Sequence, residues 1–246
     1  MSFAIGPGLA KRLQQYQDEP ASDEVYFKNA KGQTQWSEAM GKSGRIYRHL
    51  AASNEVHVFD PASSIVSGGG PDPVPMPTIV QVPSPNNWLT RQGQDAIAIV
   101  IHTMSGTLAG ADAWFKDPAS EVSAHYGVGL GEGRVHQYVS LASAAWANGQ
   151  IEPGNVWPGP PDVNPNLLTV SIETEDNNNP GQPVTEAQYN ATLGCCRLAL
   201  ARFPSITYLL GHDRISPQTR SNCPGKRWRA SGAMASLAKT LGLEQR

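Results

Sequence analysis

The stretch AIAIVIH at residues 96–102 is an unbroken apolar run, rich in isoleucine and valine, that ends in a histidine. Such a run is typical of a strand that is buried on both faces of a sheet. Two further stretches, LLTVSIETE (167–175) and ITYLLGH (206–212), also predict apolar strands with polar residues at or near their ends. Three strands of this kind predict a buried sheet with polar side chains at the strand ends.

Helical patterns lie between and after these strands. The spacing of apolar residues predicts helices at 108–117, 185–203 and 231–243. The second is the clearest, because Thr185 and Gln188 have the spacing of a capping box. It also carries an apolar stripe, made of Tyr189, Leu193, Cys196, Leu200 and Phe203.

A hairpin is predicted between the first helix and the second long strand. Residues 122–130 and 134–140 are strand candidates that flank the turn sequence GEG. Strands interleaved with helices indicate an α/β domain in which helices pack on a mixed central sheet.

Residues 61–77, PASSIVSGGGPDPVPMP, are predicted to be a linker, because they combine a glycine triplet with repeated prolines. The stretch separates a small N-terminal accessory segment (1–60), whose role the sequence does not give, from a main domain at 78–246. Within the accessory segment the pattern predicts a polar helix at about 8–18 and a strand at 54–59.

The bulk composition argues against several function classes. A net charge of −2 is not that of a protein with a long basic surface for nucleic acid. No apolar run approaches the roughly 18 residues of a membrane span, and the N-terminus MSFAIGPGLAKRLQQ lacks the order of a signal peptide. We therefore expect no nucleic-acid partner, no membrane insertion, and synthesis in the cytoplasm without a signal peptide.

The three cysteines are too few for a disulfide framework. Cys195 and Cys196 lie in an apolar helical run, where burial explains them. Cys223 lies instead in the polar loop sequence SNCPG, where core packing is a poor explanation. Another role is needed for this thiol.

Two histidines offer that role, since His102 and His212 each end an apolar strand and Cys223 lies on the loop after His212. Two imidazoles and one thiolate suit a tetrahedral zinc site with an open fourth position, as in catalytic zinc sites. A single histidine at a strand end is more often a hydrogen-bonded loop residue. The spacing alone therefore leaves both interpretations open.

The local sequences resemble a known family, the type 2 N-acetylmuramoyl-L-alanine amidases, whose superfamily includes phage endolysins, recycling amidases and peptidoglycan recognition proteins. The resemblance covers about residues 78–245. Its expected activity is hydrolysis of the amide between N-acetylmuramic acid and L-alanine in peptidoglycan. Six motifs carry it, in family order and spacing: SPNNWLTRQGQDAIAIVIH (84–102), SAHY (123–126), WANG (146–149), IETE (172–175), GHD (211–213) and CPG (223–225).

The resemblance implies that His102, His212 and Cys223 bind one zinc ion per chain. Many members have aspartate as the third ligand, and others, phage lysins among them, have cysteine. The resemblance also implies that Glu173 is the catalytic carboxylate. Strand geometry does not separate Glu173 from Glu175, because both point to one strand face, so this choice rests on family position.

Two positions near the predicted site depart from the family pattern. Several relatives carry lysine two residues before the third ligand, where this chain has Ser221. We predict that Ser221 donates a weaker hydrogen bond to the oxyanion, with Arg214 and Arg220 as nearby cations. Ala124 is at the position where relatives of the phage-lysozyme type have an active-site tyrosine. Tyr126, two residues later, is predicted to contact substrate in place of that tyrosine, with packing as the alternative.

A third departure is Ala147, in a motif that commonly reads Trp-His-Ala-Gly and here reads WANG. We expect it to affect substrate contacts rather than zinc chemistry. Trp146 and Asn148 are predicted to bind substrate, with loop packing as the alternative. His125 is predicted to be a structural histidine, not a ligand.

Other functions stay open. Recognition proteins of the same fold bind peptidoglycan without cutting it, although they typically lack the third ligand, and another zinc hydrolase, such as a deacetylase or peptidase, is a further alternative. The amidase itself would be either a phage-type lytic enzyme that reaches the cell wall by another route or a cytoplasmic enzyme that recycles soluble muropeptides. The accessory segment favours the lytic role on the polymer, and we expect a monomer.

Overall fold

A computed structural model of the chain describes residues 25–28, 34–40, 46–50, 55–59, 77–131 and 133–246. The chain divides into two compact units, Met1–Pro73 and Val74–Arg246. Within the described residues, no helix combines the length and the apolar character that crossing a membrane requires.

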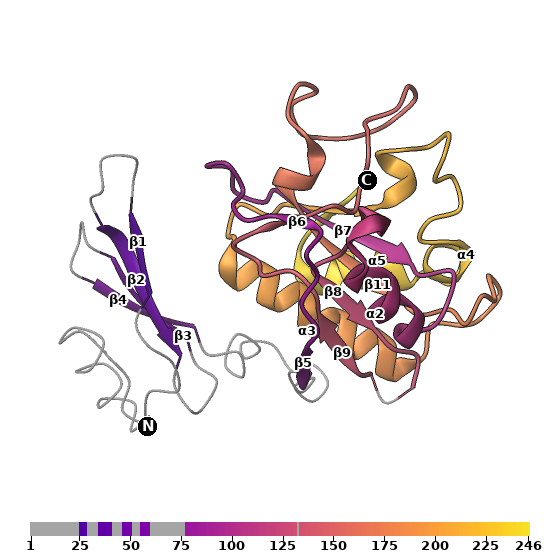
Figure 1. Cartoon of the computed structure of the whole chain (residues 1–246), viewed down its shortest axis with the longest axis horizontal. Coiled ribbons are helices and arrows are strands. Elements are labelled where there is room, and N and C mark those ends of the chain that lie inside the picture. Colours follow the sequence, from indigo (N-terminus) through magenta and orange to yellow (C-terminus); the bar gives the residue numbers. More distant parts are fainter. Residues whose placement is uncertain (1–24, 29–33, 41–45, 51–54, 60–76, 132) are drawn as a thin grey trace. The chain divides into compact units, whose positions relative to one another are not determined.

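The described part of the first unit is an antiparallel sheet in the order β1-β2-β3-β4 (Figure 1). One strand matches the sequence prediction at 54–59. The other three were missed, because short mixtures of polar and apolar residues give no clear periodic signal. The helix expected at 8–18, and the expected linker at 61–77 except its last residue, lie outside the described residues. The strands are β1 (Val25–Lys28), β2 (Thr34–Met40), β3 (Ile46–Leu50) and β4 (Glu55–Phe59).

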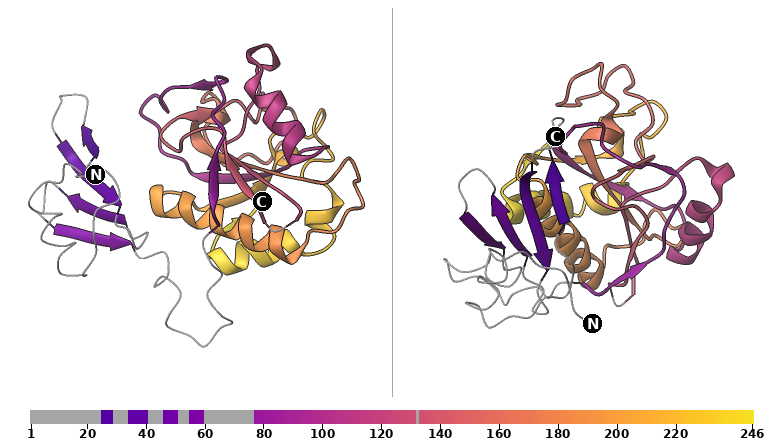
Figure 2. Two further views of the ribbon diagram at one scale, coloured as in Figure 1. Left: turned by 60° about the horizontal axis from the view of Figure 1, so that its bottom comes forward. Right: turned by 60° about the vertical axis from the view of Figure 1, so that its left-hand side comes forward.

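The second unit is built on a seven-stranded mixed sheet, as the sequence predicts (Figures 1 and 2). All neighbouring strands are parallel except β8 and β9, which form the predicted hairpin. In spatial order the strands are β13 (Glu244–Gln245), β12 (Tyr208–Gly211), β7 (Ala98–Thr103), β11 (Thr169–Thr174), β8 (Tyr126–Val128), β9 (Val135–Gln137) and β5 (Ile79–Gln81).

Helices cover both faces of this sheet (Figure 2). Helices α3 (Glu186–Arg202) and α5 (Ala233–Leu241) pack on one face, where Ile99 and Ile101 of β7 join the largest core cluster. Helix α2 (Leu108–Lys116) lies against the other face. The remaining elements are short: β6 (Asn87–Trp88), β10 (Ala144–Ala145), η1 (Pro118–Ser120), η2 (Pro165–Leu168), η3 (His212–Arg214) and α4 (Lys226–Arg229).

Helix α3 differs from its prediction in two details. Thr185 Oγ1 accepts from Gln188 N at 3.1 Å, but the Gln188 side chain does not return to the cap; it is buried and donates to the carbonyls of Val128 and Glu175. The predicted stripe does face the core: Leu193, Cys196 and Phe203 are buried in the largest core cluster, and Tyr189 and Leu200 pack against it. The buried side is wider than the stripe and includes small and polar residues. Its buried residues are Gln188, Ala191, Thr192, Leu193, Gly194, Cys195, Cys196 and Ala199.

Candidate metal centre

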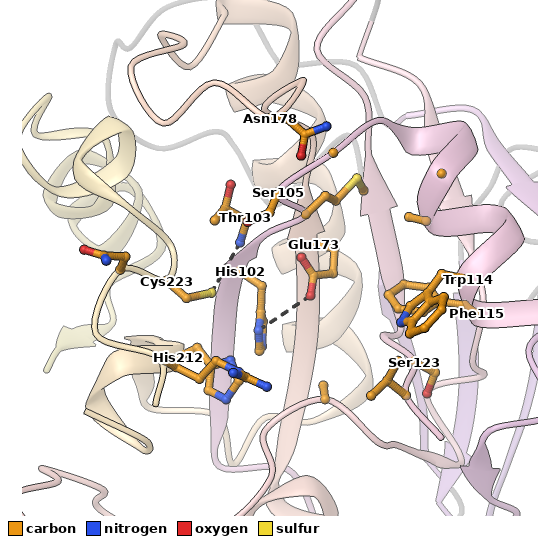
Figure 3. A pocket seen from close by; sticks show the side chains of 18 of the residues that line it. His102, Thr103, Ser105, Trp114, Phe115, Ser123, Glu173, Asn178, His212 and Cys223 are labelled. Carbon is orange, nitrogen blue, oxygen red and sulfur yellow. Dashed lines mark hydrogen bonds and ion pairs between the residues drawn. The ribbon is translucent and has the colours of Figure 1, made fainter. Parts of the chain in front are cut away.

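The polar strand ends meet at one edge of the sheet. β7, β11 and β12 are parallel, so their carboxyl ends lie at the same edge. His102 lies opposite Glu173 in the register of β7 and β11, and His212 is the first residue after β12. Because successive strand residues point to opposite faces, His102 points away from Ile101 and the core under α3. It points to the face on which the loop carrying Cys223 closes (Figure 3).

His102, His212 and Cys223 come together at this edge. One potential ligand atom from each lies within 4.8 Å of the other two, and the two imidazole centroids are 4.5 Å apart. His102 is 1% exposed and His212 is 5% exposed, so both rings are removed from solvent. Three donor atoms at this separation can bind one ion between them.

Backbone hydrogen bonds hold Cys223 in place. Its carbonyl oxygen accepts from Asp213 N at 2.9 Å, and its own N–H donates to Arg220 O at 2.9 Å. Thr103 N, on the residue after His102, lies 3.4 Å from the sulfur and donates to it. The loop therefore presents the thiol to the two strand-end histidines without help from a core contact.

The histidine hydrogen bonds indicate which ring nitrogens are available. His212 Nε2 lies 3.0 Å from the carbonyl oxygen of Asn148, which only accepts, so Nε2 carries the proton and Nδ1 keeps a lone pair. His102 Nε2 is buried and has no hydrogen-bond partner among the described residues. The Asn148 side chain is close enough to this ring to oppose the lowering of its pKa, and its Oδ1 is likewise buried without a hydrogen-bond partner among the described residues.

Burial favours the neutral form of all three donors. It lowers the pKa of His102 well below 6.5, with His212 adding to the shift, and it lowers the pKa of His212 to about 4. Burial, with the charge of Glu173, also raises the pKa of the Cys223 thiol. Neutral imidazoles offer lone pairs, and a divalent cation favours thiolate over thiol. Two nitrogens and a sulfur with these properties fit zinc.

Glu173 lies beside this cluster, with Oε1 at 3.7 Å from His102 Nδ1 (Figure 3). Its side chain is 16% exposed, and Oε2 is buried with no hydrogen-bond partner among the described residues. Burial raises the pKa of Glu173 to about 8, Asp176 adds to the rise, and Arg220 opposes it. A carboxyl group with a pKa near neutrality is suited to accept and return a proton.

Glu175, which strand geometry alone did not separate from Glu173, has a different environment. It follows the end of β11 and is 9% exposed. Its two oxygens accept from Leu108 N at 3.1 Å and from Leu130 N at 2.8 Å. These bonds tie the start of α2 to the sheet, so Glu175 is a structural residue.

The cluster opens into a pocket of about 750 Å³. Trp146 lines it, half-buried and in edge-to-face contact with Trp88 at 5.8 Å. Ser221, the expected oxyanion donor, also lines it and is exposed. The structure thus brings both residues to the pocket that His102, Glu173, His212 and Cys223 share.

Tyr126 and Asn148 do not reach the pocket as expected. Tyr126 is 2% exposed and packs in the core cluster under α3, because its position in β8 turns it to the opposite face of the sheet from Glu173. Asn148 is fully buried, and its side chain donates to Thr169 Oγ1 at 2.7 Å. Asn148 contacts the metal-binding cluster from within the core: its backbone carbonyl accepts from His212 Nε2, and its side chain interacts with His102 and opposes the lowering of the His102 pKa.

His125 has the structural role that the sequence suggests. It is fully buried, its Nδ1 accepts from Ser171 N at 3.1 Å, and its Nε2 lies 2.8 Å from Arg91 Nη2.

Sequence reasoning missed two residues near the site. Asp176 accepts from Thr103 Oγ1 at 2.8 Å, a contact without a local signal. Trp114 lines the pocket. It does not lie on the apolar side of the helix predicted at 108–117, and this position could have indicated that its side chain is exposed.

Comparison with known sequences agrees with this geometry. Residues 92–226 match the sequence model of the N-acetylmuramoyl-L-alanine amidase family. N-acetylmuramoyl-L-alanine amidase A of Achromobacter lyticus is 38% identical over 63 residues, which make up 26% of this chain and 35% of that protein. The match thus spans about a third of the length of this relative.

Solved structures show the same fold. A selenomethionine derivative of AmpD superposes with a TM-score of 0.53 at 24% identity, over 66% of this chain and 94% of AmpD. A mutant of PlyL superposes with a TM-score of 0.51 at 15% identity, over 67% of this chain and 98% of PlyL. Each match covers about two thirds of this chain and nearly all of the other protein.

Proposed function

The chain belongs to the N-acetylmuramoyl-L-alanine amidase family, and we propose that it is a zinc-dependent hydrolase of the amide bond between N-acetylmuramic acid and L-alanine in bacterial peptidoglycan. The observation that carries this proposal is the meeting of His102, His212 and Cys223 within 4.8 Å beside a buried carboxyl group. A binding module has no need of that carboxyl group.

The proposed metal ligands are His102, His212 and Cys223. When bound, zinc supplies a Lewis acid that makes water nucleophilic near neutral pH and polarises a carbonyl group. Asn148 supports this chemistry by fixing the tautomer of His212 through its carbonyl oxygen. Thr103 supports it by donating its N–H to the sulfur of Cys223.

Glu173 is the proposed general base and acid. It would take a proton from the attacking water and pass it to the leaving nitrogen of L-alanine. Its free oxygen, Oε2, makes no competing hydrogen bond among the described residues. A cation beside it lowers the pKa from about 8 toward the range in which the carboxylate accepts a proton. Ser221 is retained as the proposed hydrogen-bond donor to the oxyanion.

We further propose a lytic enzyme of phage type that acts on the cell wall as a monomer. The support is the additional unit, with its own four-stranded sheet, beside an amidase domain at 78–246. An enzyme restricted to small soluble muropeptides would not need a second unit to bind a polymer.

The test is digestion of purified peptidoglycan with and without a chelator, with products identified by mass spectrometry. The proposal predicts glycan strands with intact lactyl groups and peptides with a free L-alanine amine. The chelator should stop their release, and added zinc should restore it. Binding to the polymer without any bond cleavage would support the recognition-module alternative instead.

A further inference from the structure

The pocket has two chemically different walls, one on each side of the metal-binding cluster (Figure 3). In the close-up, Trp114 and Phe115 lie on one side of Glu173 and His102, and Cys223 lies on the other. We call the first side the helix wall, made of Gly110, Ala111, Trp114 and Phe115 of α2, and the second the loop wall, made of Thr219, Arg220, Ser221 and Asn222.

The helix wall is uncharged and ends in an exposed aromatic ring. Trp114 is 58% exposed, although most large apolar side chains of this unit are buried. Gly110 and Ala111 add no long side chain to the wall, so the indole remains accessible. An exposed tryptophan at the rim of a reaction pocket offers a flat apolar face with negative π density. That face suits an uncharged ring with polarised C–H bonds, which is the chemistry of a sugar.

The loop wall carries a cation, Arg220, that forms no ion pair within the described residues, although its charge lowers the pKa of the nearby Glu152. Arg220 is exposed, and the one side-chain hydrogen bond recorded for it is to the carbonyl of its neighbour Thr219 at 3.3 Å. No carboxylate in the described part of the chain lies within ion-pair distance of its guanidinium. A free guanidinium in this position suits a carboxylate of the substrate.

The backbone that carries Arg220 is held from two sides. Arg220 N donates to Ser216 O at 2.8 Å. The Glu152 carboxylate accepts from Gln218 N at 2.7 Å and from Thr219 N at 3.0 Å. Arg220 therefore projects from a defined position next to the cysteine ligand.

We propose that these two walls orient the substrate: the muramic acid ring stacks on Trp114, and the peptide lies along the loop wall with a carboxylate on Arg220. The proposal rests on the proposed amidase function. The two sides of the scissile amide differ in the same way as the walls, because the sugar is uncharged and the peptide bears carboxylates. Trp114 and Arg220 would then determine specificity rather than take part in bond cleavage.

Three small substrates test this orientation. The first is N-acetylmuramoyl-L-alanyl-D-glutamate, the second is the same compound with both glutamate carboxylates amidated, and the third is lactoyl-L-alanyl-D-glutamate, which lacks the sugar. Each is measured for kcat/KM, and the sugar-free compound is also measured as a competitive inhibitor. The variants are Trp114→Ala, Arg220→Met and Arg220→Lys in the full chain.

We expect Trp114→Ala to lower kcat/KM about tenfold on both sugar-bearing substrates, as loss of one aromatic contact would, and to leave handling of the sugar-free compound within about twofold. We expect Arg220→Met to lower kcat/KM about ten- to a hundredfold on the two substrates with free carboxylates, as loss of a charged hydrogen bond would, with little change on the amidated one. Arg220→Lys should recover part of this loss, because it keeps the charge but not the planar fork.

Two exposed residues outside the pocket serve as matched controls: Leu89→Ala for the apolar change and Arg134→Met for the charge change. Neither should alter the preference among the three substrates. An equal loss on all three substrates, no loss, or an exchange of the two patterns would overturn the proposed orientation. Failure of the wild-type protein to release L-alanyl-D-glutamate from the first substrate would overturn the amidase function itself, which is a distinct result.

Discussion

Two buried polar clusters lie on adjacent parts of this domain, and they differ in how completely their atoms are paired. In the first, Glu175, Gln188 and Arg227, both oxygens of Glu175 accept backbone N–H groups. Gln188 uses its nitrogen and its oxygen, and only Nε of Arg227 lacks a partner. This cluster joins α2, α3 and α4 to the sheet.

The second cluster is His102, His212, Cys223 and Glu173. Here His102 Nε2 and Glu173 Oε2 are buried without hydrogen-bond partners among the described residues. Burial lowers the pKa values of the two histidines and raises those of Cys223 and Glu173, so it favours the neutral form of all four groups. Buried polar groups are normally paired. This contrast indicates that the second cluster is arranged to bind a group that is not part of the chain, whereas nearly all polar atoms of the first cluster are paired within the chain.

The largest expected effect is that of Cys223→Ala. Removing the sulfur leaves two imidazoles, which are too few ligands for a stable zinc site, so zinc content and amidase activity should be lost together. Metal analysis of the purified protein and release of peptide amines measure the two losses. The control is Cys196→Ala, which removes a buried thiol outside the pocket and should keep one zinc per folded chain. A Cys223→Ala protein that binds zinc and stays active would contradict the assignment of Cys223 as a metal ligand.

Glu173→Gln should separate turnover from metal binding. It keeps the shape of the side chain but removes proton transfer, which typically contributes about 10²- to 10⁴-fold. We expect kcat to fall by that factor while zinc content stays at the wild-type level. Wild-type kcat in this variant would show that another group moves the proton.

Glu175→Ala tests the first cluster. It leaves two backbone N–H groups, those of Leu108 and Leu130, without partners, which should lower the free energy of unfolding by about 2–4 kcal/mol. Urea denaturation measures this loss, with the exposed residue Asp162→Ala as the control that should change stability little. Zinc bound per folded chain should remain unchanged, and preferential loss of zinc without loss of stability would contradict the division into two clusters.

A further effect, confined to the metal-free protein, is a change of stability with pH. Because burial raises the pKa of Glu173 from 4.5 to about 8, the folded chain holds a proton that the unfolded chain has released between these values. The free energy of unfolding should therefore fall as pH rises through this window, by at most about 1.4 kcal/mol per pH unit from this residue.

The comparison of wild type with Glu173→Gln isolates this contribution, since the glutamine does not ionise. Urea unfolding with a chelator present measures the free energy of unfolding of both proteins. From pH 5 to pH 8 this free energy should fall more for the wild type than for the variant. The histidines shift stability in the opposite direction, because their lowered pKa values favour folding as pH rises through about 4 to 6.5, but both proteins share them. A constant difference across the range would mean that Glu173 is not buried as described.

The sequence predicted those features that depend on strong local patterns. The apolar runs that became β7, β11 and β12 indicate buried strands directly, and a parallel arrangement brings their ends, with His102 and His212, to one edge. Helix α3 and the hairpin of β8 and β9 follow from equally local signals. The family motifs added the prediction that Glu173 is the catalytic carboxylate, a choice that periodicity could not make between Glu173 and Glu175.

The sequence did not predict which face of the sheet each side chain occupies, or the contacts between residues far apart in the chain. For Tyr126 the sequence left substrate contact and packing open, and the register of β8 turns it into the core, as the packing alternative has it. Asn148 was predicted to bind substrate, with loop packing as the alternative; it is buried, and its backbone carbonyl contacts His212. A carbonyl carries no residue-specific signal, so only the folded chain reveals it.

Zinc-edge X-ray absorption of the zinc-loaded protein tests the proposed metal ligands, because it reports which atoms bind the metal. We predict one zinc per chain, bonded to one sulfur and two imidazole nitrogens, with loss of the sulfur signal in Cys223→Ser. A protein that takes up no zinc, or a zinc ion with no sulfur bonded to it, would contradict the assignment of His102, His212 and Cys223 as its ligands.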